Sequence, residues 1–321
     1  MSDIPTTKPS AIDTVEKGES LWVGAWYRLR KNKMALAGGV FILLLAGLSF
    51  MGPFFLEGDY YTNTVLEDKL TAPGAEYTLG TDHLGRDQLG RIIKGGQISL
   101  LVGLVATFVS LTIGIGYGTI SGYFGGKIDS VMMRLVDILY SLPFVIFVIL
   151  LMVFAKDLGD SIDEWFRARG SEFSISGQWN MLLLFVAIGA VEWLTMARIV
   201  RGQVMSLRQQ EFIEACISLG LPTRRILFRH MVPNILGPVI VYTTLTIPAV
   251  MLLEAFLSFL GLGVQPPTPS WGLLIKDGAD RMREAWWMLV FPGALFAITL
   301  FSFNFVGDGL RDALDPKTSK D

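Results

Sequence analysis

The chain has 321 residues, of which 51% are hydrophobic and 17% are charged. This composition is too apolar for an ordinary soluble domain, and it indicates an integral membrane protein. The formal net charge of −2 lacks the strongly basic balance that is typical of nucleic-acid-binding proteins, so no nucleic-acid partner is expected.

Residues 1–33 are expected to form a cytoplasmic N-terminal segment. Residues 1–17 are polar and carry no hydrophobic periodicity, which predicts disorder. From Ser20, a favourable N-cap residue, apolar residues fall near one helical face and basic residues crowd the end of the helix. The apolar residues are Leu21, Trp22, Trp26 and Leu29, and the basic ones are Arg28, Arg30, Lys31 and Lys33. This pattern predicts an amphipathic helix that lies on the membrane lipid.

Six apolar runs are each long enough to cross the hydrocarbon core of a bilayer, which predicts an all-α polytopic membrane protein with six transmembrane helices. They occupy residues 34–55, 99–123, 130–155, 181–199, 235–260 and 287–305. The first run is too long for a signal-peptide core and lacks a small-residue cleavage site after it, so we expect the protein to retain it. Prolines inside three of the runs predict bent helices, and they are Pro143, Pro238, Pro248 and Pro292.

Two features predict how the second and third runs pack. Gly114, Gly118 and Gly122 recur every four residues on one helical face, and small residues at this spacing allow another helix to approach closely. We favour packing inside the same subunit over contact with a partner subunit. Arg134 and Asp137 lie three residues apart on the third run, so they are predicted to form an ion pair.

Residues 201–234 are polar and basic between two strongly apolar runs, so they must lie in water while the flanking runs lie in lipid. Residues 211–219 are predicted to form a short helix, with Gly220 as its left-handed terminating residue. Thr223 is the predicted N-cap of a second short helix that ends before Pro233. A helical hairpin of this kind projects from a membrane and does not span it.

Seven residues of this loop carry a resemblance to a known motif. They are, in order, Glu214, Ala215, Gly220, Ile226, His230, Pro233 and Asn234. Their order resembles the cytoplasmic EAA loop of binding-protein-dependent ABC import permeases. The resemblance implies that the loop docks the permease onto a separate ATPase, and Arg224 and Arg225 complete the predicted docking residues. A hairpin that merely links two spans is the alternative interpretation.

Other motifs extend the resemblance along nearly the whole chain from about residue 21. They are Gly80-Thr81-Asp82 with Gly85-Arg86-Asp87, residues 254–263 with Pro269-Ser270-Trp271-Gly272, and residues 307–312 with Leu314-Asp315-Pro316. These motifs resemble the C-type membrane subunit of the oligopeptide, dipeptide and nickel permeases, and oligopeptide permease most of all. The resemblance implies the type I ABC importer permease fold and a location in the bacterial inner membrane.

The distribution of basic residues predicts the orientation of the chain. If both termini are cytoplasmic, 17 of the 27 Lys and Arg residues lie inside and 10 outside, as the positive-inside rule requires. Residues 56–96 and 156–180 are then external. The expected organisation is a first transmembrane helix with an external segment over 34–96, a five-helix permease core over 97–306 and a cytoplasmic tail over 307–321.

No catalytic site or metal centre is recognisable in the sequence. The residues Gly125, Gly126 and Lys127 do not have the spacing of a phosphate-binding loop, so the chain is expected neither to be an enzyme nor to bind a cofactor. His83 and His230 have no Cys or acidic cluster at ligand spacing, so no metal is expected.

Two acidic residues inside the apolar runs, Glu192 and Glu254, are candidate pathway or gating residues, because intramembrane acids are functional candidates by default. The single cysteine, Cys216, cannot form an intrachain disulfide.

The expected function is that of a permease subunit in an ATP-driven importer of peptides, most of all oligopeptides. The resemblance implies four kinds of partner: a homologous second permease, two cytoplasmic ABC ATPases, an extracytoplasmic peptide-binding protein and the membrane lipid. The alternatives are an importer of nickel or another small solute in the same family, and a secondary transporter that uses Glu192 and Glu254 as a proton relay. The second alternative would be expected to show an internal repeat with paired broken helices, and the sequence has no convincing one.

Overall fold

A computed structural model describes residues 21–56, 58, 60–170 and 176–314 of the chain. Within these ranges the protein is almost wholly helical and has no β-strand, which confirms the predicted all-α class. The helices are α1 (Leu21–Lys31), α2 (Lys33–Met51), α3 (Gln88–Phe124), α4 (Gly126–Ser141), α5 (Phe144–Arg167), α6 (Ser176–Arg208), α7 (Glu211–Ser218), α8 (Thr223–Arg225), α9 (Val232–Phe259), α10 (Trp271–Asp280) and α11 (Trp287–Leu314). Two 3-10 turns, Gly52–Phe54 and Leu66–Asp68, and one π-helix, Ile226–Met231, complete the set. The expectations for residues 1–17 and for Ser20 lie outside the described residues.

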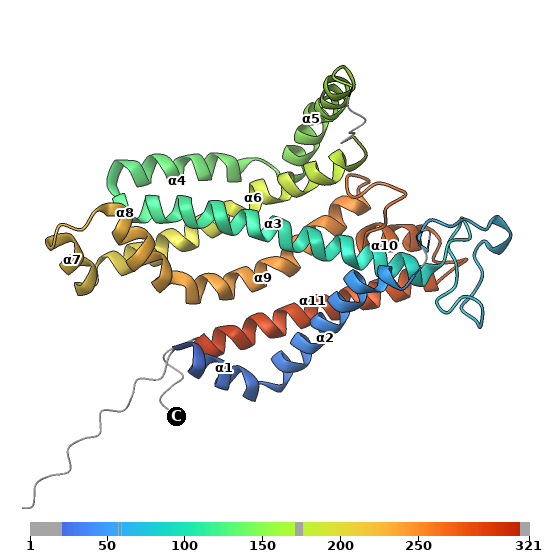
Figure 1. Cartoon of the computed structure of the whole chain (residues 1–321), viewed down its shortest axis with the longest axis horizontal. Helices are drawn as coiled ribbons and strands as arrows, with labels where there is room; N and C mark the ends of the chain where they lie inside the picture. Colours follow the sequence, from blue (N-terminus) through green and yellow to red (C-terminus); the bar gives the residue numbers. More distant parts are fainter. Residues whose placement is uncertain (1–20, 57, 59, 171–175, 315–321) are drawn as a thin grey trace, which may run out of the picture.

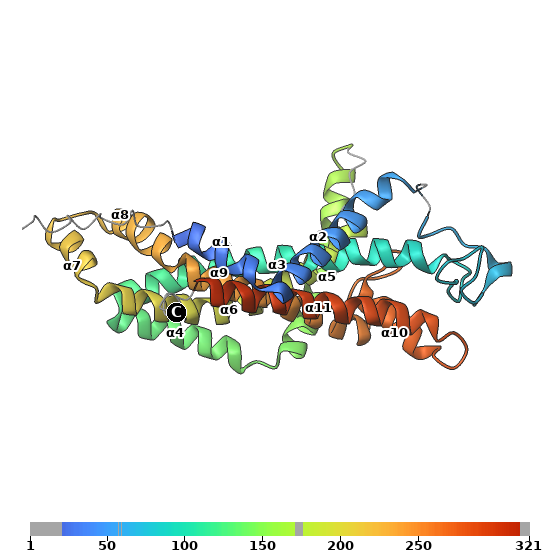
Figure 2. The same cartoon turned by 90° about the horizontal axis from the view of Figure 1, so that it is seen from below.

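The long helices run side by side along the long axis of the molecule (Figures 1 and 2). Helix α3 packs on α6 and α9, α9 packs on α11, and α11 packs on α2. Helices α7 and α8 lie at one end of this bundle. The segment before α3 and the short helix α10 lie at the other end (Figure 1). The two polar regions are therefore separated by the full length of the spanning helices.

Five helices are individually long and apolar enough to cross a membrane. They are Lys33–Phe54, Gln88–Phe124, Met181–Arg208, Thr223–Phe259 and Trp287–Leu314. The predicted third span, residues 130–155, is not one helix. It is broken into α4 and α5, which meet at an angle of 91° and count as a sixth span only as a pair. Leu142 is extended because the ring of Pro143 disfavours the helical conformation in the residue before it, so the proline breaks the helix and does not merely bend it.

Several helices extend beyond the apolar runs that predicted them. Helix α3 begins at Gln88, inside the predicted external segment, because the Asp87 carboxylate accepts hydrogen bonds from the amides of Leu89 and Gly90 and caps the helix. Helix α5 continues into the predicted loop as far as Arg167, and α11 continues into the predicted tail as far as Leu314. Hydropathy marks the part of a helix that fits in lipid, whereas capping decides where the helix ends.

The glycine stripe of α3 packs on α6 of the same chain. A Cβ atom on Gly118 would lie 2.5 Å from the carbonyl oxygen of Ala197, and one on Gly122 would lie 2.8 Å from that of Arg201. A Cβ atom on Gly114 would lie 2.5 Å from the Met196 side chain and 3.2 Å from the Ala197 amide nitrogen. The prediction of packing inside the subunit is therefore confirmed, since the backbone of α6 already occupies this face.

We expect Gly118→Ala to destabilise the protein, because the new methyl group would overlap backbone atoms that cannot move independently. Overpacking of this kind costs about 1–3 kcal/mol. Gly116 lies on the same helix with open space around it, and Gly116→Ala should be neutral. Thermal unfolding of the two purified variants in detergent tests this, and equal midpoints would show that the helices can separate without loss of stability.

The first helix packs against the last one. The Arg28 side chain donates a hydrogen bond from Nε to the carbonyl oxygen of Ala313 at 2.9 Å. A Cβ atom on Gly309 would lie 2.4 Å from that of Ala35 and 3.1 Å from the Leu29 side chain, so the helices touch closely. The described ends of the chain consequently lie at the same end of the bundle (Figure 1). Val23, Trp26 and Tyr27 on α1 remain exposed, as a helix lying on lipid would require.

Candidate functional site

The polar loop begins with a tight helix ending. Gly220 has φ +70°, its amide donates to Ile217 O at 2.9 Å, and the Leu221 amide donates to Cys216 O at 3.2 Å. These two bonds form a Schellman motif, in which a left-handed residue lets the chain turn back over the last helical carbonyls. The left-handed conformation that the sequence predicted for Gly220 is therefore present.

The second part of the loop differs from the prediction. Pro222, not Thr223, occupies the N-cap position of α8, and the helix does not end before Pro233. It continues through the π-helix into α9, so Thr223–Phe259 counts as a single candidate span by length and composition. Proline has no amide hydrogen, but the wider π register allows the chain to pass it without losing the helix: the Val232 amide donates to Leu227 O, five residues back.

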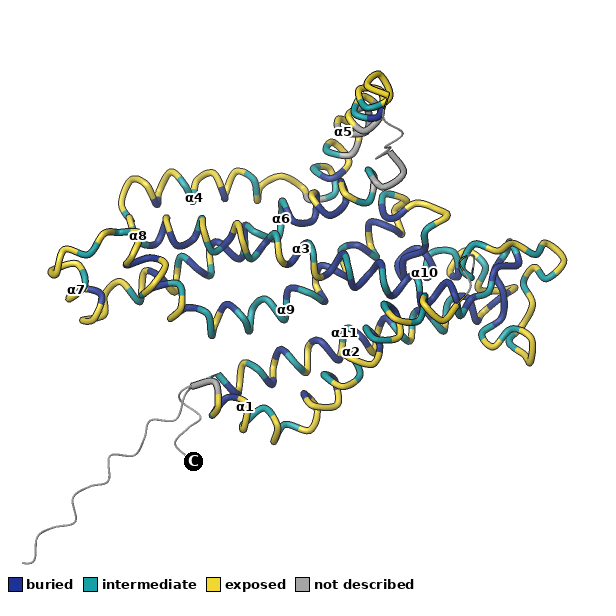
Figure 3. Tube along the Cα trace, viewed as in Figure 1, coloured by how far each residue is buried: buried dark blue, intermediate teal, exposed yellow. Residues whose placement is uncertain are grey.

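The loop has one buried side and one exposed side. Ile213, Ile226 and Met231 are fully or almost fully buried and pack on α6 and the start of α9, and this packing fixes the position of α7 against the bundle. The opposite side is exposed (Figure 3). It combines apolar and charged side chains, which are Glu211, Phe212, Glu214, Ile217, Leu219, Arg224, Arg225, Phe228 and Arg229. Leu219 is 78% exposed and Phe228 is 68% exposed, as expected of residues that a partner protein covers.

The structure brings the predicted docking residues to one end of the bundle. Ala215, Gly220, Pro233 and Asn234 are exposed there along with the charged residues, whereas His230 is half-buried. The Asn234 side chain donates to the carbonyl oxygen of His230 and so satisfies a backbone acceptor within the π segment. Glu214 forms no ion pair with any described residue, so its carboxylate is free to contact another chain.

Glu254 is completely buried where α3, α9 and α10 meet. Its carboxylate accepts hydrogen bonds from Ser258 Oγ at 2.7 Å and from Ser99 Oγ at 3.3 Å. Ser99 Oγ also accepts from the amide of Trp271, at the first turn of α10. Glu254 therefore links α3 and α9 directly, and Ser99 extends this hydrogen-bond network to α10.

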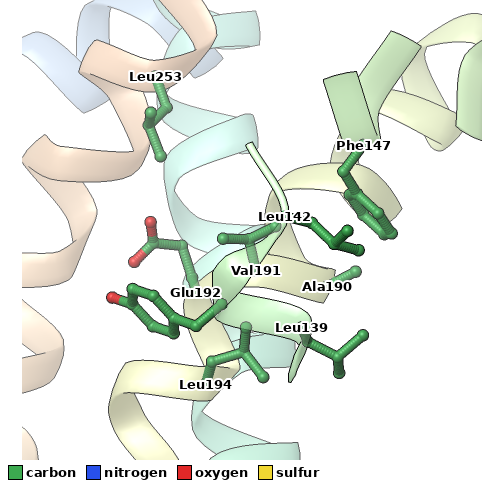
Figure 4. A pocket seen from close by; sticks show the side chains of 9 residues that line it. Leu139, Leu142, Phe147, Ala190, Val191, Glu192, Leu194 and Leu253 are labelled. Carbon is green, nitrogen blue, oxygen red and sulfur yellow. The ribbon is translucent and has the colours of Figure 1, made fainter. Parts of the chain in front are cut away.

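Glu192 lies in a different environment. It lines a cavity of about 300 Å³ at the junction of α4, α5, α6 and α9. Figure 4 shows its carboxylate pointing toward the side of the cavity on which Leu253 lies, away from Leu142 and Phe147. No described residue donates a hydrogen bond to this carboxylate or forms an ion pair with it. Of the two predicted pathway acids, Glu192 borders this cavity and Glu254 is completely buried.

Charged pairs link α4 to α6. Asp137 pairs with Arg198 at 2.7 Å, so the predicted pairing of Asp137 with Arg134 is wrong. Spacing along one helix predicted Arg134, but Asp137 points across to the neighbouring helix. The carboxylate of Asp129 forms a bidentate contact with Arg201, with both distances 2.5 Å. Two separate ion pairs therefore connect α4 to α6.

The predicted external segment, residues 56–96, contains a buried charge cluster that the sequence did not predict. Asp82 is fully buried and accepts hydrogen bonds from Arg86 Nε at 2.7 Å and Arg91 Nη1 at 2.5 Å. Arg91 also reaches Asp277 on α10 at 3.5 Å. Burial alone would raise the pKa of Asp82, but Arg91 and Arg86 outweigh it and hold that pKa below its usual value. The Asp82 cluster, formed by these four residues, joins the segment before α3 to α3 and α10.

The glycines of the same motif explain the tight fold around the cluster. Gly80 and Gly85 have φ of +77° and +75°, and a Cβ atom on Gly85 would collide with the carbonyl oxygen of Val65. The indole of Trp287 at the start of α11 donates to Thr81 O at 3.1 Å. The repeated Gly-x-Asp pattern in the sequence was the signal that could have identified this as a folded element and not a solvated loop.

Comparisons with known proteins cover most of the chain. Residues 114–320 match the family described as "Binding-protein-dependent transport system inner membrane component". Residues 20–73 match "N-terminal TM domain of oligopeptide transport permease C".

Curated relatives are similar over almost the whole chain. The oligopeptide transport system permease protein OppC of Escherichia coli (strain K12) is 48% identical over 303 residues, which are 94% of this chain and 93% of the relative. OppC of Bacillus subtilis (strain 168) is 42% identical over 95% of this chain and 92% of its own length. The dipeptide transport system permease protein DppC of the same organism is 41% identical over 91% of this chain and 85% of its own length.

Proposed function

Since the chain belongs to the family of inner membrane components of binding-protein-dependent transport systems, we propose that it is the permease subunit of an ATP-driven importer of oligopeptides. The observation that carries this proposal is the similarity to oligopeptide permeases, 48% identity over 94% of the chain. The exposed loop with its apolar and charged side chains supports it, because a transport subunit without its own nucleotide site needs a surface for an ATPase.

The proposed partners follow from the surfaces that the isolated chain leaves uncovered. The exposed side of the polar loop would contact an ABC ATPase, with Glu214, Arg224 and Arg225 as charged contacts. Helix α4 is exposed along much of its length (Figure 3), and a homologous permease would pack near it. Two ATPases and an extracytoplasmic peptide-binding protein complete the complex, and ATP binds only to the ATPases.

Purification of the chain with its partners and reconstitution into vesicles tests the function. We expect uptake of a labelled tetrapeptide that requires ATP and the binding protein, and no ATP hydrolysis by the chain alone. Uptake of nickel instead of peptide would identify the alternative substrate class. Uptake driven by a proton gradient without ATP would reject the proposal in favour of a secondary transporter.

The proposed orientation puts both termini and the polar loop in the cytoplasm. Two exposed positions at opposite ends of the bundle, Asn63 and Ser218, are suited to a labelling test. In a Cys216→Ser background, a membrane-impermeant thiol reagent applied to intact spheroplasts should label Asn63→Cys and not Ser218→Cys. The reverse result would invert the topology, and labelling of both from the outside would contradict the separation of the two ends.

A further inference from the structure

The break between α4 and α5 creates a cavity at a discontinuous span. The last turn of α4 and the start of the linker provide Leu139, Tyr140 and Leu142, while α6 provides Glu192 and three apolar neighbours. Leu253 of α9 closes another side. Broken helices at membrane depth are tolerated only where they are covered by protein or line a cavity, and transporters place substrate sites at such breaks.

The residues that line this cavity include one acidic side chain, Glu192, and no basic one. Glu192 has no hydrogen-bond or ion-pair partner among the described residues. An ionised carboxylate in an apolar, half-buried site is unfavourable unless a cation compensates it. The C-terminal turn of α4 faces the same space, and the partial negative charge of a helix C-terminus also favours a cation.

The neighbouring cation is already engaged elsewhere. Arg198 pairs with Asp137 at 2.7 Å, and its guanidinium lies 4.4 Å from the centre of the Tyr140 ring. The Tyr140 hydroxyl is itself hydrogen-bonded to Thr195 Oγ1 at 2.9 Å. These contacts engage Arg198 with Asp137 and Tyr140, so a cation that balances an ionised Glu192 would come from outside the described residues.

We propose that this cavity binds the N-terminal ammonium group and first side chain of a peptide in transit, with Glu192 as the counter-ion. The inference rests on the proposed function and adds a specificity-determining residue to it. A single carboxylate among apolar walls matches the chemistry of a peptide's first residue, in which a primary ammonium stands next to a side chain. The volume of about 300 Å³ is sufficient for one residue and not for a whole peptide.

Transport by the reconstituted complex is the first test. Glu192→Gln keeps the shape of the side chain and removes its charge, so the initial rate of tetra-alanine uptake should fall about tenfold, the loss of one modest charge pair. Glu192→Asp retains the charge and should stay within about threefold of the wild type. Equal rates for the wild type and Glu192→Gln would overturn the inference. A wild-type complex that imports no peptide at all would instead overturn the proposed function.

Thiol labelling separates a substrate site from a structural acid. In the complex with Cys216→Ser, Ala190→Cys places a thiol in the wall of the cavity. Aminoethyl methanethiosulfonate carries the same primary ammonium as a peptide, and it should react about tenfold faster than its uncharged methyl analogue, a preference that Glu192→Gln abolishes. If the preference is absent, or if neither reagent reaches the thiol, Glu192 is a structural or partner-covered acid and the inference is wrong, even where Glu192→Gln slows transport.

Discussion

Gly220→Val is expected to reduce substrate-stimulated ATP hydrolysis of the reconstituted importer at least about tenfold while leaving membrane insertion intact. A left-handed conformation costs an L-residue roughly 1–2 kcal/mol, and more for a β-branched one. A Cβ atom at position 220 would meet nothing within 4 Å, so the substitution acts through backbone conformation alone. The altered turn would change the direction in which α8 and the π-helix leave α7, and the exposed contact residues would separate.

A series at the same position provides the controls. Gly220→Asn should retain most activity, because Asn tolerates φ > 0, and Gly220→Ala should lie between Asn and Val. Glu214→Ala should also reduce substrate-stimulated ATP hydrolysis, since the free carboxylate of Glu214 is proposed to contact the ATPase. This substitution should leave the turn at Gly220 unchanged. Full stimulation in Gly220→Val would mean that the loop only connects two spans and does not transmit the signal from the ATPase.

Local patterns in the sequence predicted the parts of this fold that depend on neighbouring residues. Five of the six apolar runs coincide with helices long and apolar enough to span a membrane, since burial in lipid requires a long apolar segment, whereas the third run is broken into two helices. Gly220 was predicted to be left-handed because few residues other than Gly adopt that conformation at a helix end. Pro143 was recognised as a perturbation, but whether a proline bends or breaks a span depends on the helices around it.

Features made by residues far apart in the chain were not predictable in this way. The hydrogen bond from Ser99 to Glu254 joins two helices, and nothing in either local sequence specifies the other. Asp137 had a basic residue three positions away, and yet it pairs with Arg198 on α6. Residue spacing along one helix identifies possible ion-pair partners on that helix only. The packing of two helices against each other determines which residues actually form the ion pair.

Asp82→Asn is expected to lower the stability of the purified protein by about 3–5 kcal/mol, the usual consequence of removing one member of a buried ion pair. Asp82 and the Arg91 side chain are 0% and 1% exposed, so water cannot replace the missing charge. Asp277 makes a longer contact of 3.5 Å with Arg91 and is 20% exposed, which makes Asp277→Asn the matched control with a smaller expected effect. The midpoint of thermal unfolding in detergent at pH 7 measures both.

The double variant Asp82→Asn with Arg91→Met distinguishes a lost charge pair from a generally damaged loop. If the unpaired Arg91 causes the loss, removing its charge should restore part of the stability, because an apolar replacement for a buried ion pair is often tolerated.

The contribution of Asp82 to stability should depend on pH, and the direction of its pKa shift fixes the sign of that dependence. Since the pKa of Asp82 is lowered by folding, its ionisation stabilises the protein above the unfolded pKa of about 3.9, and this contribution is lost as pH falls through the folded value. The wild type should therefore remain more stable to unfolding than Asp82→Asn from pH 8 to pH 5. This difference in stability should disappear only in stronger acid. An advantage that already disappears near pH 6 would mean that Asp82 is not held ionised by Arg91 and Arg86.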